Sequence, residues 1–251
     1  MSIMRAFIAA NVTASKWFDK TFLPPSYITD GNNDFVENVV PAHLLHGMKI
    51  YDVGGGKRPY LAVERKASLS AYVVGVDISQ HELDCAPAGA YDETICADIS
   101  QLKGSGDGDL VICQAVLEHV RDTEGAKRSI ASLLKPGGKA LIFVPSRNAV
   151  FARLNLILPQ QLKRWILYTI YPSKRYAQGF PSFYHRCTPS EFVAMAASNG
   201  LDKVHAHYYY TSSYFSFLFP LYVLWRAWVV LFKAFAGYQA SETFSLVFVK
   251  K

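Results

Sequence analysis

The sequence predicts an α/β fold of the doubly wound type, with helices on both faces of a mostly parallel sheet. Short apolar runs alternate with helical segments between residues 48 and 145. The first run ends in Asp52 and is followed at once by three glycines, Gly54–Gly56. The next run ends in a second acid, Asp77. Strands that alternate with helices in this way favour βαβ units and a parallel sheet.

The expected elements follow in order along the chain. The runs that end in acids are short and apolar, as strands buried on both faces are, and the glycine triplet permits a sharp turn into a helix. A proline and two glycines at 136–138 break the second long helix before the fifth strand. We expect strands at 48–53, 72–77, 93–97, 110–113 and 139–144, and helices at 59–68 and 123–134.

The two ends of the chain extend this core. Before it, aromatic residues at 17–23 suit one face of a helix that ends at Pro24, and 31–33 reads as a turn. After it, Thr188 and Glu191 form a capping box for a helix that Gly200 stops. Strands are expected at 201–209 and 243–249. We therefore divide the chain into a lead-in at 1–47, a core at 48–145, an insertion at 146–187 and a C-terminal part at 188–251.

The glycine triplet and the second acid suggest a nucleotide-like ligand. Gly54–Gly56 let a ligand approach the backbone closely, and Asp77 stands where an acid accepts hydrogen bonds from a ribose. A strict dinucleotide fingerprint needs a further glycine where Pro59 stands. The sequence therefore indicates a nucleoside-containing cofactor, and the alternative is an ordinary turn without a ligand.

Three further pieces carry a family resemblance: 96–99 (Cys-Ala-Asp-Ile), 109–120 with its Leu-Glu-His-Val ending, and 133–144 around Lys-Pro-Gly-Gly. With the glycine loop, they make residues 48–145 resemble the class I S-adenosylmethionine (SAM)-dependent methyltransferases, in the branch that includes ubiquinone-biosynthesis and natural-product enzymes. A looser similarity continues at 187–192. The resemblance implies a Rossmann-like methyltransferase fold of seven strands, the last two antiparallel at the sheet edge.

The resemblance also implies a cofactor site. Asp52, Gly54 and Gly56 would hold the amino acid end of SAM. Asp77 would bind the ribose hydroxyls, and Asp98 would face the adenine amino group. Ile78 and Ile99, which follow these acids, would also contact the cofactor. Gln114 would meet the cofactor at the end of the fourth strand. The cofactor residues implied by the resemblance are Asp52, Gly54, Gly56, Asp77, Ile78, Asp98, Ile99 and Gln114.

The chain departs from the family pattern at two positions. The third glycine of the family loop falls on Arg58, so we expect the loop to approach the methionine carboxylate differently. Related quinone O-methyltransferases carry an acid implicated in metal binding where this chain has Ala115. We therefore predict no metal site.

Methyl transfer to a hydroxyl needs a group that removes its proton. His119 is the first candidate for a catalytic base, because it follows the fourth strand beside the expected cofactor pocket; the alternative is that it only packs against the next helix. His185 is the second candidate, in a segment able to fold over the pocket. Glu118 is expected to fix a histidine or a helix end.

Charge is divided unevenly along the chain. Residues 1–124 hold 10 Lys and Arg against 17 Asp and Glu, whereas residues 125–251 hold 16 against 3. The basic half is expected to face something anionic. Four cysteines without CxxC spacing indicate a reducing compartment and no structural zinc, and we expect no signal peptide at residues 1–12.

Two segments of the basic half suggest a surface contact. Residues 146–187 contain no acid and form either a substrate lid or a basic surface that rests on anionic lipid. Residues 214–237 are long enough to span a membrane, but flanking strands paired in one sheet would exclude one complete crossing. We expect a helical hairpin broken at Pro220, lying in the membrane interface with Tyr222, Trp225 and Trp228 at headgroup depth. The alternative is a homodimer interface.

The sequence thus predicts a SAM-dependent methyltransferase, held peripherally at the inner face of the cytoplasmic membrane. Its expected reaction is O-methylation of an amphiphilic acceptor, such as a lipid-linked saccharide, a polyprenyl-borne intermediate or a quinone precursor. Two alternatives remain: a soluble small-molecule methyltransferase with an apolar dimer interface, and a non-catalytic SAM-fold scaffold of a membrane complex. No nucleic acid partner is expected, because the basic residues are interleaved with aliphatic runs.

Overall fold

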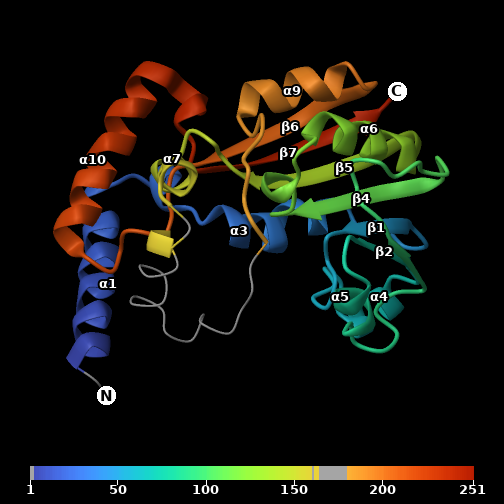
Figure 1. The fold of residues 1–251 in the computed structure, drawn as a ribbon, viewed down its shortest axis with the longest axis horizontal. Coiled ribbons are helices and arrows are strands. Elements are labelled where there is room, and N and C mark those ends of the chain that lie inside the picture. The colour runs from blue at the N-terminus through green and yellow to red at the C-terminus, as the bar shows by residue number, and fades with distance from the viewer. Residues whose placement is uncertain (1–2, 160, 164–179) are drawn as a thin grey trace.

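A computed structural model describes residues 3–159, 161–163 and 180–251 (Figure 1). Seven strands form one sheet in the order β3-β2-β1-β4-β5-β7-β6. The strands are β1 (Lys49–Val53), β2 (Tyr72–Asp77), β3 (Glu93–Cys96), β4 (Gly108–Gln114), β5 (Leu134–Pro145), β6 (Leu201–Tyr209) and β7 (Thr243–Lys250). The first five run parallel, and β7 lies antiparallel between β5 and β6. The predicted doubly wound, seven-stranded fold is confirmed.

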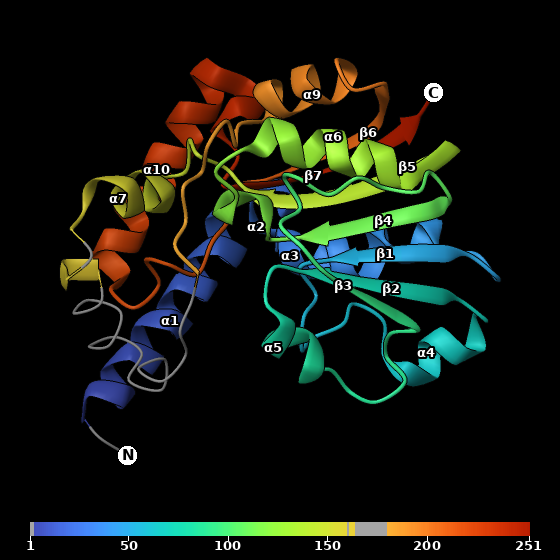
Figure 2. The same ribbon diagram turned by 45° about the vertical axis from the view of Figure 1, so that its right-hand side comes forward.

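Helices cover both faces of this sheet. The longer ones are α1 (Ile3–Phe22), α6 (Thr123–Leu133), α7 (Val150–Ile157), α9 (Pro189–Ala197) and α10 (Phe219–Ala236). The shorter ones are α2 (Pro25–Ile28), α3 (Gly31–Asp34), η1 (Phe35–Val39), η2 (Pro41–His43), α4 (Val63–Ser68), α5 (Gln80–Asp84), η3 (Leu117–His119) and η5 (Gly237–Ala240). Side chains of α6, α9 and α10 pack on one face, and those of η1 pack on the other. Figure 2 shows α6 and α9 stacked over β4, β5 and β7.

The central strands read as buried apolar runs because both of their faces are covered. Val74 of β2 and Val111 of β4 belong to the same buried cluster as the inward side chains of α6, whereas Val73 and Leu110 belong to the cluster that includes the side chains of η1. The acids at the ends of the first strands are therefore carried to one edge of the sheet. This edge is where ligands bind in open α/β sheets.

Three local predictions were wrong. Residues 31–33 form the start of helix α3 instead of a turn, because the Asp30 side chain accepts a hydrogen bond from Asn33 N. The helix expected at 59–68 begins only at Val63, as α4. The Asp52 side chain accepts a hydrogen bond from the Tyr60 amide and so holds the preceding residues in the loop. Strand β5 begins at Leu134 instead of residue 139, with a register shift opposite Gly108.

The C-terminal insertion, residues 214–237, was predicted as a helical hairpin broken at Pro220, and this prediction was wrong. Helix α10 is continuous, and Pro220 lies in its first turn, where a missing N–H costs no hydrogen bond. Tyr222 and Trp225 are 4% exposed and belong to the core instead of an outer surface. Trp228 is 51% exposed.

Among the described residues, 219–240 is the one helical stretch long and apolar enough to cross a membrane. The strands on either side of it, β6 and β7, are paired antiparallel in the sheet. Both ends of α10 are therefore tied to the same body of the protein, and one complete crossing is excluded.

Candidate cofactor and active site

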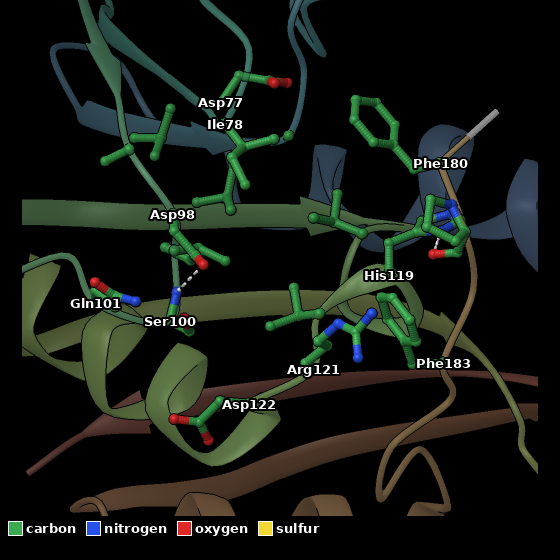
Figure 3. Close-up of a pocket in the computed structure, with 18 of the residues that line it drawn as sticks. Asp77, Ile78, Asp98, Ser100, Gln101, His119, Arg121, Asp122, Phe180 and Phe183 are labelled. Carbon is green, nitrogen blue, oxygen red and sulfur yellow. Dashed lines mark hydrogen bonds between the residues drawn. The ribbon is translucent and has the colours of Figure 1, made fainter. Parts of the chain in front are cut away.

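Two adjoining cavities open at the carboxyl ends of β1, β2 and β4. The first has a volume of about 610 Å³ and the second about 790 Å³. They share Val53, Gly54, Ala115 and Phe180 in their walls. Figure 3 shows the first cavity, with Asp77 and Asp98 on one side and His119 and Phe180 across from them. A single elongated ligand can occupy both cavities.

The first cavity is framed by the acids that follow β2 and β3. Asp77 Oδ1 accepts the Ser79 amide at 2.9 Å, and Asp98 Oδ1 accepts the Ser100 amide at 2.8 Å. These turns fix both carboxylates at the cavity wall. Ile78 and Ile99 lie beside them and give the cavity apolar surfaces. Burial raises the pKa of Asp77 from its ordinary value.

The glycine loop between β1 and α4 fits closely around these acids. Gly54 has φ +75° and Gly56 has φ +47°, in the region that favours glycine. A Cβ on Gly54 would overlap Val116, and one on Gly56 would lie 2.9 Å from Asp77 Oδ2. Gly54 lines both cavities, whereas Gly56 is absent from their walls and acts by letting the loop approach Asp77.

Asp52 lines the second cavity and organises the loop. Its Oδ2 accepts the Tyr60 amide at 2.7 Å and the Tyr91 hydroxyl at 3.3 Å. Burial raises the pKa of this carboxyl to about 6. Asp52 therefore combines a structural role with a position at the wall.

Gln114 also lines the second cavity, and its partner was missed from the sequence. Gln114 Nε2 donates to Asn32 Oδ1 at 2.8 Å, so α3 contacts the end of β4. A Cβ on the preceding Gly31 would overlap Tyr209, so the helix packs closely on the sheet. The glycine and two asparagines suggested only a turn, and no local signal pointed to this long-range contact.

Charged groups concentrate in the second cavity. Arg58, which replaces a family glycine, lies in its wall with His81. Lys57 Nζ pairs with Glu82 Oε1 at 2.9 Å. Arg58 therefore adds a cation to this wall.

His119 of η3 lies in the wall of the first cavity. Its Nδ1 is 3.0 Å from the Pro181 carbonyl, which can only accept, so this nitrogen carries the proton and donates. In the neutral imidazole the lone pair is then on Nε2, which lies 3.7 Å from Glu118 Oε1. Burial raises the pKa of Glu118 to about 8, so its carboxyl is mostly neutral at pH 7.

His185 lies away from both cavities. It is exposed, and its Nδ1 is 3.3 Å from Thr123 Oγ1, at the first residue of α6. Neither cavity wall includes it. The structure therefore brings His119, but not His185, to the expected cofactor residues.

Within the described part of the chain, no group of three or more His, Cys, Asp or Glu side chains could hold a metal ion. Ala115 lines both cavities, with φ +53°. Phe180, Phe183 and Arg121 complete the wall near His119, with Arg121 stacked on Phe183 at 4.2 Å. These three residues lie in loops, and no motif in the sequence pointed to them.

The donor set suits an adenosyl cofactor. Two carboxylates border an apolar slot of nucleoside size, and a glycine loop lies at its junction with a polar cavity. The antiparallel β7, inserted between β5 and β6, completes the seven-stranded sheet that the sequence predicts. Fold and site together define a Rossmann-like domain whose adjoining cavities have walls that suit an adenosyl cofactor.

Comparison with known proteins shows which enzymes the chain is similar to. A family described as "Methyltransferase domain" matches residues 51–142. A ubiquinone biosynthesis O-methyltransferase of Idiomarina loihiensis is 30% identical over 197 residues, covering 75% of this chain and 79% of the relative. The enzyme of the same name from Aeromonas salmonicida is 27% identical over 207 residues, covering 78% and 81%.

Solved structures agree on the fold. A SAM-dependent methyltransferase of Mesorhizobium loti superposes with a TM-score of 0.55 at 16% identity, covering 84% of this chain and 96% of the other. A phosphoethanolamine N-methyltransferase of Haemonchus contortus, in complex with SAM, has a TM-score of 0.55 at 15% identity, covering 100% and 60%. The chain belongs to the class I SAM-dependent methyltransferase family. It is a SAM-dependent enzyme.

Proposed function

We propose that this enzyme transfers the methyl group of SAM to a hydroxyl oxygen of an amphiphilic quinone precursor bound beside His119. The observation that carries the proposal is the position of His119, in the same cavity wall as Asp77 and Asp98. The names of the relatives support oxygen as the acceptor atom. A lipid-linked saccharide or another polyprenyl-borne hydroxyl would use the same geometry.

The cofactor residues have distinct roles in this proposal. Asp77 accepts hydrogen bonds from the ribose hydroxyls, and Asp98 faces the adenine amino group. Ile78 and Ile99 contact the adenine faces in the apolar slot. Gly54 lets the loop approach the amino acid end, and Gly56 lets the loop approach Asp77. Asp52 and Gln114 lie at the second cavity.

When bound, SAM supplies a methyl group on a sulfonium, whose bonding electrons stay on sulfur as the methyl leaves. His119 prepares the acceptor: Nδ1–H is held by Pro181 O, and Nε2 takes the hydroxyl proton. The acceptor oxygen then forms the new bond to carbon. Phe180 and Phe183 hold an aromatic ring near this point and exclude water.

The proposed site of action is the inner face of the cytoplasmic membrane, with contacts through 146–187 and 214–237. The exposed apolar side of α10 supports the second contact. Of the first segment, residue 160 and residues 164–179 lie outside the described part of the chain. The alternatives are a soluble enzyme that dimerises through 214–237 and a scaffold that lacks catalysis.

The test is a mass-spectrometric methylation assay with SAM and two catechols, one water-soluble and one carrying a prenyl chain. We expect methylation at oxygen, a preference for the prenylated acceptor, and a loss of about 10²–10⁴-fold in kcat for His119→Ala, the range of general base catalysis. SAM affinity, measured by calorimetry, should not change in this variant. His185→Ala is the matched control and should keep wild-type kcat.

Other outcomes separate the alternatives. Equal activity on both catechols would favour the soluble enzyme. SAM binding without methylation of any hydroxyl acceptor would overturn oxygen as the acceptor. Absence of SAM binding in the folded protein would leave the scaffold.

A further inference from the structure

Helix α10 has its charges on the side that faces the protein and its large apolar groups on the side that faces outward. Its two charged residues, Arg226 and Lys233, both contact side chains of the protein body. Arg226 is 1% exposed, pairs with Asp19 and donates to the Tyr27 carbonyl at 2.8 Å. Lys233 Nζ lies 4.2 Å from the centre of the Tyr27 ring. This is the reverse of the pattern of a helix on a water-exposed surface.

The outward side of α10 is apolar along its whole length. Leu224, Trp228, Leu231 and Phe235 recur at the spacing of one helical face, opposite the buried Tyr222 and Val229. Leu224 is 69% exposed and Phe235 is 89% exposed.

Helix α1, which neighbours α10, carries an exposed apolar stripe of its own. It packs on α10 through Asp19, through Phe18 against Phe219, and through Asn11, which accepts the Phe219 amide at 2.7 Å. The two helices lie along one side of the molecule, away from α4 and α5 (Figure 1). The exposed apolar stripe of α1 begins at Ile3, which is 90% exposed. The outer α1–α10 surface comprises Ile3, Phe7, Trp17, Leu224, Trp228, Leu231 and Phe235.

The charges around this surface have one sign. One acid, Asp19, occurs in residues 3–22, 150–163 and 214–238 taken together. Its charge is paired with that of Arg226. Lys16 and Lys20 are exposed on α1, and Arg153 lies on α7, which is beside α10 in both views (Figure 1, Figure 2). An apolar surface flanked by cations suits anionic lipid headgroups above acyl chains.

A second copy of the chain fits this surface less well. A two-fold interface would bring the same surface of each copy together, and with it Lys16 and Lys20 of each. Like charges brought together in this way weaken association. Trp17 and Trp228, by contrast, are the residue type that concentrates at membrane–water interfaces.

We infer that the exposed apolar stripes of α1 and α10 together form a platform that docks on the surface of an anionic bilayer. Both helices contribute apolar side chains to the acyl boundary, and the buried pair of Asp19 and Arg226 holds the helices at a fixed angle. The platform deepens the proposed function, on which it rests for the lipid-borne acceptor. It makes α1, besides the C-terminal insertion, a contact with lipid.

The test is flotation of the full chain with vesicles of phosphatidylcholine, with and without phosphatidylglycerol. We expect binding that requires phosphatidylglycerol and falls at least about tenfold in Trp17→Glu and in Leu231→Glu, since each variant loses an exposed apolar side chain that enters the acyl boundary on docking. Leu45→Glu is the matched control: Leu45 is equally apolar and exposed, but precedes β1 and should bind as wild type. Circular dichroism checks that each variant is folded.

The outcomes distinguish this inference from the proposed function. Unchanged flotation of Leu231→Glu, or of Trp17→Glu, would overturn the platform. So would a wild-type dimer in light scattering that these variants dissociate and that does not float with vesicles. Methylation of the water-soluble catechol without vesicle binding would remove the platform and keep the enzyme. Vesicle binding without any methylation would keep the platform and remove the proposed reaction.

Discussion

Asp19 of α1 and Arg226 of α10 form a buried ion pair, with Oδ1 and Nε 3.0 Å apart. Tyr222 donates its hydroxyl to the other Asp19 oxygen at 2.6 Å. The guanidinium also donates to the Tyr210 carbonyl at 2.5 Å, so it connects α10 to both α1 and the end of β6. Among the described residues, this network fixes the first and the last α-helices to each other.

Replacing Arg226 by Met should therefore destabilise the protein. Removal of one partner leaves Asp19 buried and unpaired, which costs about 3–5 kcal/mol in comparable sites. Urea unfolding followed by circular dichroism measures this loss. The double variant Asp19→Asn with Arg226→Met should recover part of it, because the two residues share one network. Wild-type stability in the single variant would contradict a stabilising role for the pair.

Asp77→Asn should weaken SAM binding while the fold is kept. The carboxylate is positioned by the Ser79 amide at the cavity wall, and a hydrogen bond to a charged group contributes about 1.5–3 kcal/mol, or roughly 10- to 100-fold in affinity. Calorimetric titration with SAM and S-adenosylhomocysteine measures it. Asp84→Asn, on the exposed side of α5, is the control. Equal affinities for the two variants would show that Asp77 does not hold the ribose.

Gly56→Ala should also reduce SAM affinity, through two effects that a control separates. The new Cβ would lie 2.9 Å from Asp77 Oδ2 and 3.0 Å from Glu82 Cβ, at a φ of +47°. Gly137 has a similar φ, +78°, but no heavy atom within 4 Å of its Cβ position. Gly137→Ala should therefore show backbone strain alone, with a lower melting temperature and normal affinity. If both variants bind SAM equally well, the close approach to Asp77 is not needed.

The buried Glu118 should make stability depend on pH. Burial raises its pKa to about 8, and Oε2 has no hydrogen-bond partner among the described residues. Because the folded state holds a proton that the unfolded state releases near its ordinary pKa, stability is highest below that value. It falls as the pH rises towards 8, by at most ~1.4 kcal/mol per pH unit.

Glu118→Gln removes this proton and should flatten the profile over the same range. Urea unfolding of both proteins at several pH values measures the difference between them. Asp52 and Glu242, whose pKa values are also raised by burial, to about 6 and about 7, contribute equally to both curves and cancel in that difference. A constant difference across the range would mean that Glu118 is already ionised in the folded protein.

Much of the geometry of the candidate cofactor site was predictable because it is encoded locally. Asp77 and Asp98 follow apolar runs, so their place at the carboxyl edge comes from strand order alone. The cap of α9 was equally local: the Thr188 hydroxyl accepts the Glu191 amide at 3.4 Å and donates to Glu191 Oε2 at 2.6 Å. Neighbours in sequence make these contacts, so the pattern of residues specifies them.

Other parts of the site depend on contacts between distant segments. Asn32 reaches Gln114 only because α3 packs on the sheet, and the residues around Asn32 have the composition of a turn. The sequence ranked His119 before His185 as a candidate base but could exclude neither, because it does not show which of the two reaches the cavity. Packing placed His119 in the cavity wall and left His185 on the surface against Thr123.

The sequence by itself determined the doubly wound sheet, the glycine loop and the strand-end acids, because apolar periodicity and turn residues act over a few positions. Only the tertiary structure decided which side of α10 faces the protein. That helix is apolar nearly all round, so periodicity does not select a buried face. The choice comes from Asp19, far away in the chain, which draws Arg226 inward and leaves Leu224, Leu231 and Phe235 on the outside.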